Sequence, residues 1–388
     1  MKIVQVCTGY PPDREGGIES LVSALTKQLK ARGHHVSVIT RFWFRKIEDK
    51  TAIQYKTPEG EAKGYLAFAL RALLKILSLQ PDVVHCHGLE GAILCTLLGH
   101  LHYRTVLHLH NSLSREEGFY HPFRHRIGYQ VLREACMAAD LIVCPTQVVK
   151  YDVMEHLPSM SSSKICVVPN SALGTCYWPM EKVDELRRQM GLENKKVLLY
   201  FGKIKRSKGL EGICKAFYHL KRGNNLCLVL AGSATRTDNF LRYLRRNYPE
   251  VILTGFVDDP APYYQLADLY CIYTDGFDGG ETFAVSLAEA MVKEVPIICS
   301  ENPVYREVTR GNAFFVPPRE PEQLASSIEF ALSNPEIAKT NAARAKKIAD
   351  NLYSVNAFAS GIEEVYYQLV NGQGPQARRR GTNIIHVK

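Results

Sequence analysis

The stretch that most constrains this chain of 388 residues runs from residue 278 to residue 297. Two glycines precede Glu281, and Glu289 follows eight positions later among apolar residues at helical spacing. The pattern predicts a loop that becomes a helix at Glu281, with the two carboxylates about 12 Å apart. The N–H groups of the first turn, roughly residues 282–285, would form an anion site between them. This arrangement suits a nucleotide sugar, although glutamate pairs also occur on solvated helix faces.

Glu281, Glu289 and the seven residues between them resemble the signature of the retaining glycosyltransferases of family 4. The resemblance covers roughly residues 1–370. It implies the GT-B fold, an α/β architecture of two Rossmann-like doubly wound domains that face each other across a donor-binding cleft. Thr282 and Ala284 replace two glycines that the family usually has. The methyl group of Ala284 narrows the room beside a donor sugar.

The resemblance also implies donor-binding residues in the second half of the chain. Lys208 matches a family lysine that binds the diphosphate, and Lys203 stands in place of an arginine. This exchange keeps the charge but loses the planar fork, so Arg206 is an alternative partner for the diphosphate. Glu281 would position the sugar. The other contacts carried over from the family belong to Phe283, Ala284, Val285 and Glu289, the last of which would bind the ribose.

The first half of the chain begins with an expected strand, a loop that ends in Gly16 and Gly17, and an expected helix at 19–32. Glycines there let the backbone approach a ligand, although a plain turn explains them equally well. The family places this loop near the donor phosphates, so that role is carried over to Gly17.

Histidines end two further expected strands. Residues 82–88 resemble the family's His-x-His segment, but lone histidines are mostly structural. By alternation, His108 and His110 point to the same side of their strand. The family places a histidine at this strand end, close to the donor sugar, and His110 matches it. The resemblance therefore implies His110, Glu281 and Lys208 as catalytic residues, none of them a covalent nucleophile.

The length of the chain predicts two globular domains of ordinary size. Their expected limits are 1–178 for the acceptor side and 179–352 for the donor side, followed by a helix at 353–370 that crosses back and a basic flexible tail at 371–388. The eleven cysteines form no Cys-x-x-Cys pair and no zinc-type Cys/His spacing, which favours reduced thiols in the cytoplasm. We expect no metal, no cofactor and no membrane span.

The net charge of +9 fits an anionic partner. Nucleotide sugars, an anionic membrane and nucleic acid all qualify, but a nucleic-acid binder would not explain the glutamate pair. Basic and aromatic residues gather at 41–46 and 119–133. These segments fit peripheral association with the inner face of a membrane, and they also fit simple packing or a solvated helix.

The sequence therefore predicts a hexosyltransferase-type enzyme that moves a sugar from a nucleoside-diphosphate sugar to an acceptor hydroxyl, with retention and without metal. The expected acceptor is a saccharide or a lipid-linked molecule in envelope polysaccharide or glycolipid synthesis. Two alternatives stay open. A nucleotide-sugar 2-epimerase would consume donor without an acceptor, and a catalytically silent partner subunit would bind donor without turnover.

Overall fold

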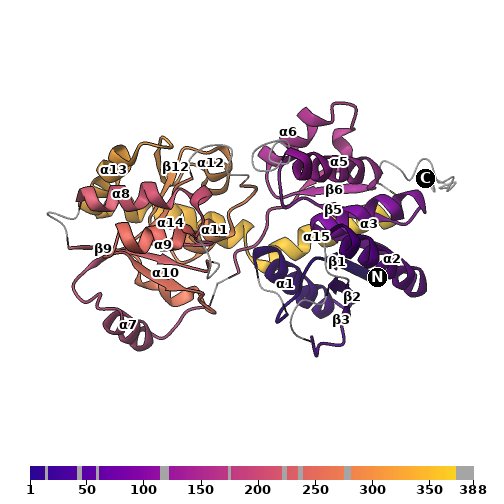
Figure 1. Ribbon diagram of the computed structural model, residues 1–388, viewed down its shortest axis with the longest axis horizontal. Helices are drawn as coiled ribbons and strands as arrows, with labels where there is room; N and C mark the ends of the chain where they lie inside the picture. Colours follow the sequence, from indigo (N-terminus) through magenta and orange to yellow (C-terminus); the bar gives the residue numbers. More distant parts are fainter. Residues whose placement is uncertain are drawn as a thin grey trace, which may run out of the picture. The chain divides into compact units, whose positions relative to one another are not determined.

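The computed structural model describes residues 1–13, 16–41, 46–57, 61–113, 122–173, 176–220, 225–234, 239–274 and 281–372, without the side chains of 61–63 and 122–127. The chain divides into two compact units. Unit 1 combines Met1–Ser171 with the segment that begins at Val355, and unit 2 is Ala172–Ser354. Each unit is a parallel sheet with helices packed against it (Figure 1).

The sheet of unit 1 has the strand order β3-β2-β1-β4-β5-β6-β7. Its strands are β1 (Lys2–Cys7), β2 (His35–Arg41), β3 (Ala52–Tyr55), β4 (Val83–His87), β5 (Thr105–His108), β6 (Leu141–Cys144) and β7 (Ile165–Val167). Its helices are α1 (Gly17–Ala31), α2 (Glu61–Leu79), α3 (Gly88–His100), α5 (Pro122–Ala138), α6 (Gln147–His156), η1 (Ser162–Lys164) and α15 (Val355–Val370). The inner strands are almost entirely buried, and most of their residues are apolar, because helices cover both faces.

The last helix, α15, is far from the rest of unit 1 in sequence but packs against α1. Figure 1 shows this yellow helix among the purple elements of unit 1. Its buried face includes Phe358, Ile362 and Tyr366. The hydroxyl of Tyr366 lies 2.7 Å from Nδ1 of His85, so α15 covers the face of the sheet on which the β4 histidines lie.

The sheet of unit 2 has the strand order β10-β9-β8-β11-β12-β13. Its strands are β8 (Lys196–Phe201), β9 (Leu226–Ala231), β10 (Ile252–Gly255), β11 (Leu269–Ile272), β12 (Ile297–Ser300) and β13 (Phe314–Val316). Its helices are α7 (Met180–Gln189), η2 (Arg206–Lys208), α8 (Leu210–Leu220), α9 (Asn239–Asn247), α10 (Ala261–Leu266), α11 (Val285–Val292), α12 (Pro303–Thr309), α13 (Pro321–Ser333) and α14 (Pro335–Leu352).

Both sheets reverse their strand order once, between β1 and β4 in unit 1 and between β8 and β11 in unit 2. The expectation of two doubly wound domains is therefore confirmed. In open sheets of this kind, ligands bind outside the carboxyl ends of the strands at the reversal. This rule identifies the loops in which a site is to be sought. Among the described helices, none is both long and apolar enough to cross a bilayer.

Candidate active site

The predicted diphosphate loop of unit 2 lies at the strand reversal, between β8 and α8. It begins at Gly202, with a φ of 153°, and ends at Gly209, with a φ of 63°, so both ends need glycine-like backbone geometry. The Nζ of Lys208 donates a hydrogen bond to Oε1 of Glu281. The side chain of Lys203 is exposed. The loop therefore brings the predicted lysine to the predicted sugar-binding carboxylate within one unit.

Arg206, the alternative partner for the diphosphate, lies in the same loop but interacts elsewhere. Its Nη1 is 3.1 Å from Oε2 of Glu211. Its guanidinium carbon is 4.9 Å from the ring centroid of Phe240 and 5.3 Å from that of Tyr243. These contacts direct the guanidinium toward the α8 and α9 helices, and a role at the diphosphate would require breaking them.

The prediction that a helix begins at Glu281 is wrong. Helix α11 begins at Val285, because Ala284 has a left-handed φ of 59° that interrupts the helix before it. The 12 Å separation along a helix therefore does not apply to Glu281 and Glu289. The anion site also shifts along the chain. The first bonds at the helix start run from the N–H groups of Leu287 and Ala288 to the carbonyl of Ala284, so the first turn of α11 lies after Ala284 and not at Glu281.

The predicted donor-binding side chains around the start of α11 differ in burial and in their contacts. Phe283 is 2% exposed and packs edge-on against Tyr353, with ring centroids 5.1 Å apart, so its side chain is part of the core. Glu289 is 5% exposed, and its Oε2 accepts a 2.9 Å hydrogen bond from the hydroxyl of Tyr264. This bond holds the second predicted carboxylate in a fixed orientation. Ala284 and Val285 are half-buried where α11 begins.

In unit 1, Gly16 and Gly17 lie at the start of α1 after the loop that follows β1. Gly16 is extended, with a φ of 177°, and Gly17 is the first residue of the helix. A Cβ at Gly17 would have no described atom within 4 Å. The structure therefore leaves open space beside Gly17, which is compatible with its predicted role near a ligand.

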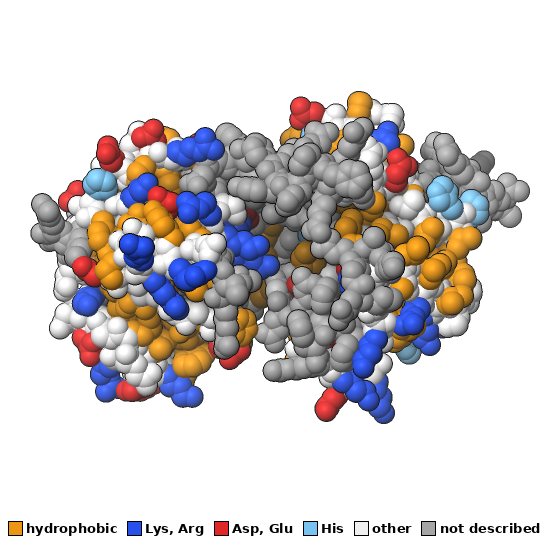
Figure 2. Space-filling view, in the orientation of Figure 1, with side chains coloured by type: hydrophobic (Ala, Val, Ile, Leu, Met, Phe, Trp, Pro, Cys, Tyr) orange, Lys and Arg blue, Asp and Glu red, His pale blue; other side chains and the backbone are white. Residues whose placement is uncertain are grey.

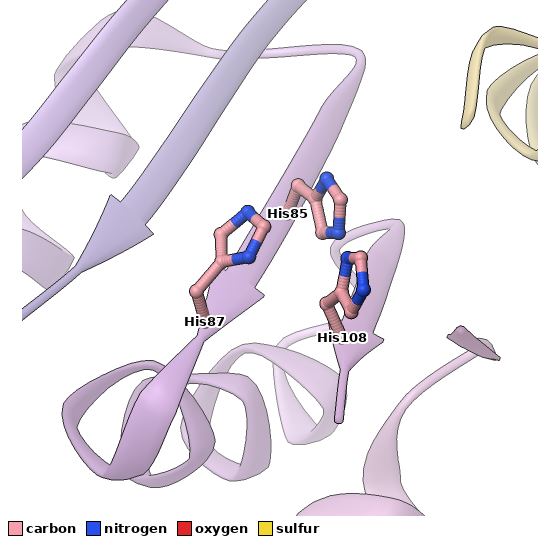
Figure 3. A group of neighbouring side chains, drawn as sticks. All are labelled: His85, His87 and His108. Atoms are coloured by element: carbon pink, nitrogen blue, oxygen red, sulfur yellow. The ribbon is translucent and has the colours of Figure 1, made fainter. Parts of the chain in front are cut away.

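Four histidines form a two-by-two group at the carboxyl ends of β4 and β5. His87 lies directly opposite His108 in the parallel ladder, and His85 and His110 lie two residues away on the same face. The rings of His108 and His110 stack with centroids 4.4 Å apart. Those of His85 and His87 are 4.1 Å apart. Figure 3 shows His85, His87 and His108 on the same side of the sheet.

His110, the predicted catalytic histidine, is half-buried at the edge of this group. Its Nε2 lies 3.0 Å from Nδ1 of His87. Burial lowers the pKa of His110 from 6.5 to about 4. The imidazole is therefore neutral near pH 7, so it acts as a hydrogen-bond donor or acceptor and not as a cation.

The basic and aromatic segments singled out in the sequence lie largely outside the described residues. This holds for 42–45, for 119–121 and for the side chains of 122–127. Arg41 is 8% exposed, and its Nη1 lies 3.3 Å from Oε1 of Glu90, so it points into unit 1 and not toward a membrane.

Two features were missed in the sequence. The histidine group was missed because its members come from two strands whose pairing is not visible in a spacing rule. A row of exposed leucines on α2 was missed because the segment was read only for its arginine and lysine. The leucines are three or four residues apart and lie outside the stripe that faces the core. That spacing is the sequence signal that could have indicated this exposed row.

Comparisons with known proteins agree with this geometry. The family profile described as Glycosyltransferase Family 4 matches residues 15–172, and the profile described as Glycosyl transferases group 1 matches residues 182–348. An uncharacterized glycosyltransferase of Methanocaldococcus jannaschii is 25% identical, covering 94% of this chain and 98% of the relative. A GDP-mannose-dependent alpha-(1-6)-phosphatidylinositol dimannoside mannosyltransferase of Mycobacterium tuberculosis is 23% identical, covering 89% of this chain and 91% of the relative.

Solved structures with the same fold include sucrose-phosphate synthase of Thermosynechococcus elongatus. Its TM-score is 0.82 at 17% identity, with coverage of 95% of this chain and 99% of that one. HepE of Anabaena in complex with UDP and glucose has a TM-score of 0.78 at 18% identity, with coverage of 94% and 99%.

Proposed function

Because this chain belongs to the glycosyltransferases of family 4, group 1, which have the GT-B fold, we propose that it moves a sugar from a nucleoside-diphosphate sugar to an acceptor hydroxyl with retention of configuration. The observation that carries the proposal is the contact between Lys208 and Glu281 at the strand reversal of unit 2. Only three residues separate Glu281 from the start of α11. A cation, a carboxylate and helix amides are the groups that a sugar diphosphate needs.

In the proposed reaction, the bond from the anomeric carbon to the phosphate oxygen breaks and a bond to the acceptor oxygen forms on the same face. The leaving phosphate takes the acceptor proton. Lys208, Lys203 and the amides that precede the first bonds of α11 stabilise the charge on the diphosphate. Glu281 positions the sugar hydroxyls, and Glu289, oriented by Tyr264, accepts from the ribose. Neutral His110 donates to a sugar hydroxyl.

The test begins with the donor. Thermal unfolding is measured with UDP-, GDP-, ADP- and dTDP-sugars, where a ligand at 100 times its Kd adds about 2.7 kcal/mol. With the donor so identified, Lys208→Met should lower kcat/KM by about 10²-fold or more, because it removes a charge from the leaving group. Lys205→Met removes the same charge from an exposed position of the same loop and should change little. Equal losses in both variants would contradict the role of Lys208.

The stereochemistry and the metal requirement need separate measurements. NMR of the first-formed product should show the anomeric configuration of the donor, and an inverted product would refute retention. After treatment with a chelator, added Mg²⁺ or Mn²⁺ should not change the rate, because lysines and amides neutralise the diphosphate. Donor consumption without an acceptor would indicate the epimerase, and binding without turnover would indicate the silent subunit.

We also propose that the acceptor is lipid-linked and that the enzyme docks on an anionic bilayer through α2. Leu66, Leu70, Leu74 and Leu77 are 60%, 51%, 68% and 37% exposed and follow one side of this helix. Figure 2 shows hydrophobic side chains gathered over α2 and α3, with basic side chains at the edge. Arg71 and Lys75 line a groove beside Leu74. Apolar side chains with flanking bases suit an anionic membrane surface.

Vesicle flotation tests this docking. The protein should float with vesicles that contain phosphatidylglycerol and stay behind with phosphatidylcholine alone. The double variant Leu70→Gln and Leu74→Gln should lose at least tenfold in membrane affinity, since each buried methylene contributes about 0.8 kcal/mol and two of them already exceed the roughly 1.4 kcal/mol of a tenfold change. Ile337→Gln, at an exposed apolar position of unit 2, is the control. Unchanged flotation, or a leucine variant that alters only the oligomeric state, would contradict membrane docking.

A further inference from the structure

Three of the four clustered histidines share an unusual pattern of hydrogen bonding. His85, His87 and His108 are at most 1% exposed. Each uses one ring nitrogen for a hydrogen bond. The other nitrogen, Nε2 of His85, Nε2 of His87 and Nδ1 of His108, has no hydrogen-bond partner among the described residues. Buried polar atoms are rarely left without a partner. Three such atoms in one group point to a ligand that the protein chain does not supply.

The bonds that the rings do make orient them for metal binding. Nε2 of His108 lies 3.2 Å from Oδ1 of Asn170, and an amide oxygen can only accept. Nε2 therefore carries the proton, and Nδ1 presents a lone pair. Nδ1 of His85 lies 2.7 Å from the hydroxyl of Tyr366, which can fix the corresponding tautomer. Metal-binding histidines usually donate their second nitrogen to a neighbouring oxygen in this way.

The geometry and the protonation state both agree with a cation site. One nitrogen from each of the three rings lies within 4.8 Å of one from each of the others. Ligand nitrogens around zinc are about 3.3 Å apart, given bonds of about 2.0 Å, so small ring rotations close the site. The three rings lie close together in Figure 3. Burial lowers the pKa of all three well below the usual value, so they are neutral, as metal ligands must be.

We propose that His85, His87 and His108 bind one divalent transition-metal ion of the zinc class at the carboxyl ends of β4 and β5. Imidazole ligands suit zinc, copper and nickel and do not suit magnesium or calcium. Three protein ligands leave a fourth position for water. The site belongs to unit 1 and is separate from the diphosphate loop of unit 2, so it does not depend on the proposed transfer reaction.

A consequence follows for His110. When Nε2 of His87 binds the metal, Nδ1 of His87 carries the proton and donates to Nε2 of His110, 3.0 Å away. The proton of neutral His110 then lies on Nδ1. The metal thus fixes which nitrogen of His110 can donate to a substrate. In this way a metal bound in unit 1 would position a residue of the proposed active site.

The test uses the full chain, stripped with a chelator and titrated with Co²⁺ and then Zn²⁺. We expect one ion per chain by elemental analysis, the visible absorption of Co²⁺ in a low-symmetry nitrogen site, and a higher Tm. X-ray absorption of the zinc form should show a shell of nitrogen ligands at about 2.0 Å. If the stripped chain binds no ion and its Tm does not move, the proposal is overturned. Donor binding is measured separately, so failure of the metal site would not refute the proposed transfer reaction.

Matched variants locate the ion. His108→Gln keeps a hydrogen-bond donor for Asn170 but removes the ligand nitrogen Nδ1. His85→Asn likewise keeps a hydrogen-bonding group for Tyr366 but removes the ligand nitrogen Nε2. Each should weaken zinc binding about 100-fold or more while near-UV circular dichroism shows a folded chain. The control is the double variant His100→Gln and His102→Gln, which removes two exposed histidines at and just beyond the C-terminal end of α3 and should bind like wild type. Loss of binding in the control, or its survival in both cluster variants, would refute the assignment.

Discussion

At Ala284 the backbone has a φ of 59°, a conformation that favours glycine, immediately before the helix that carries the predicted ribose-binding carboxylate. A non-glycine residue in the left-handed conformation destabilises the folded state by about 1–2 kcal/mol. Replacing it by glycine gives back about 0.4–1 kcal/mol of that gain, because glycine increases the conformational entropy of the unfolded chain. We therefore expect Ala284→Gly to stabilise the protein by about 0.5 kcal/mol in urea unfolding. Its missing methyl group should also let a bulkier donor sugar bind.

Glu294 offers the matched control for this prediction. It has a φ of 57°, is exposed, and lies beyond the end of α11. Glu294→Gly should give a similar gain in the free energy of unfolding and should leave the preference among donor sugars unchanged. If both variants changed donor preference equally, the effect would belong to the helix as a whole and not to the methyl group of Ala284.

At the scale of elements, one carboxylate of α15 adds two charged contacts to the apolar packing of this helix in unit 1. Oε2 of Glu363 lies 2.7 Å from Nη1 of Arg32, at the end of α1, and Oε1 lies 2.6 Å from Nε2 of His34. Burial alone would raise the pKa of Glu363, but the hydrogen bonds from His34 and Arg32 outweigh it and lower that pKa below the ordinary 4.5. Part of the attachment of α15 therefore depends on the charge of Glu363.

This charge gives a predicted pH dependence. A carboxyl group whose pKa is lower in the folded state stabilises fully above its ordinary pKa, and the contribution is lost as the pH falls through the folded value. The free energy of unfolding of wild type minus that of Glu363→Gln should therefore be constant between pH 7 and 5 and shrink below pH 4.5. The measurement is urea unfolding of both proteins across this range. A difference that grew on acidification would contradict the assignment.

The elements also show how far the sequence could be interpreted. Alternating apolar runs and helices predicted the two doubly wound sheets, because strands with both faces covered are continuously apolar. The predicted start of α11 was wrong by four residues. The helix is interrupted by the left-handed backbone at Ala284, and alanine in a sequence gives no signal of that conformation. The histidine group could not be predicted from spacing, because its members meet only through the register of β4 and β5. The order of parallel strands is set by packing of the whole domain.

At the scale of the whole molecule, the chain completes unit 1 only after it has built unit 2. It enters unit 2 at Ala172 and leaves it at Ser354. The two passages are adjacent, since the N–H of Ala172 donates to the carbonyl of Tyr353 at 2.8 Å. Unit 2 is therefore one continuous segment with its own core, whereas unit 1 depends on a helix that is made last.

This asymmetry predicts opposite outcomes for the two fragments. Residues 172–354 expressed alone should unfold cooperatively with heat and should still bind the donor diphosphate, although more weakly. Residues 1–171 lack α15, whose fully buried apolar side chains each contribute about 1.5–3 kcal/mol. The sum, about 10 kcal/mol, rivals the 5–15 kcal/mol that stabilises a typical domain. Fragment 1–171 should therefore lack a near-UV circular dichroism signal and recover it when residues 355–372 are rejoined through a flexible linker. A cooperative melt of 1–171 alone would show that α15 is an accessory and not a part of the unit 1 core.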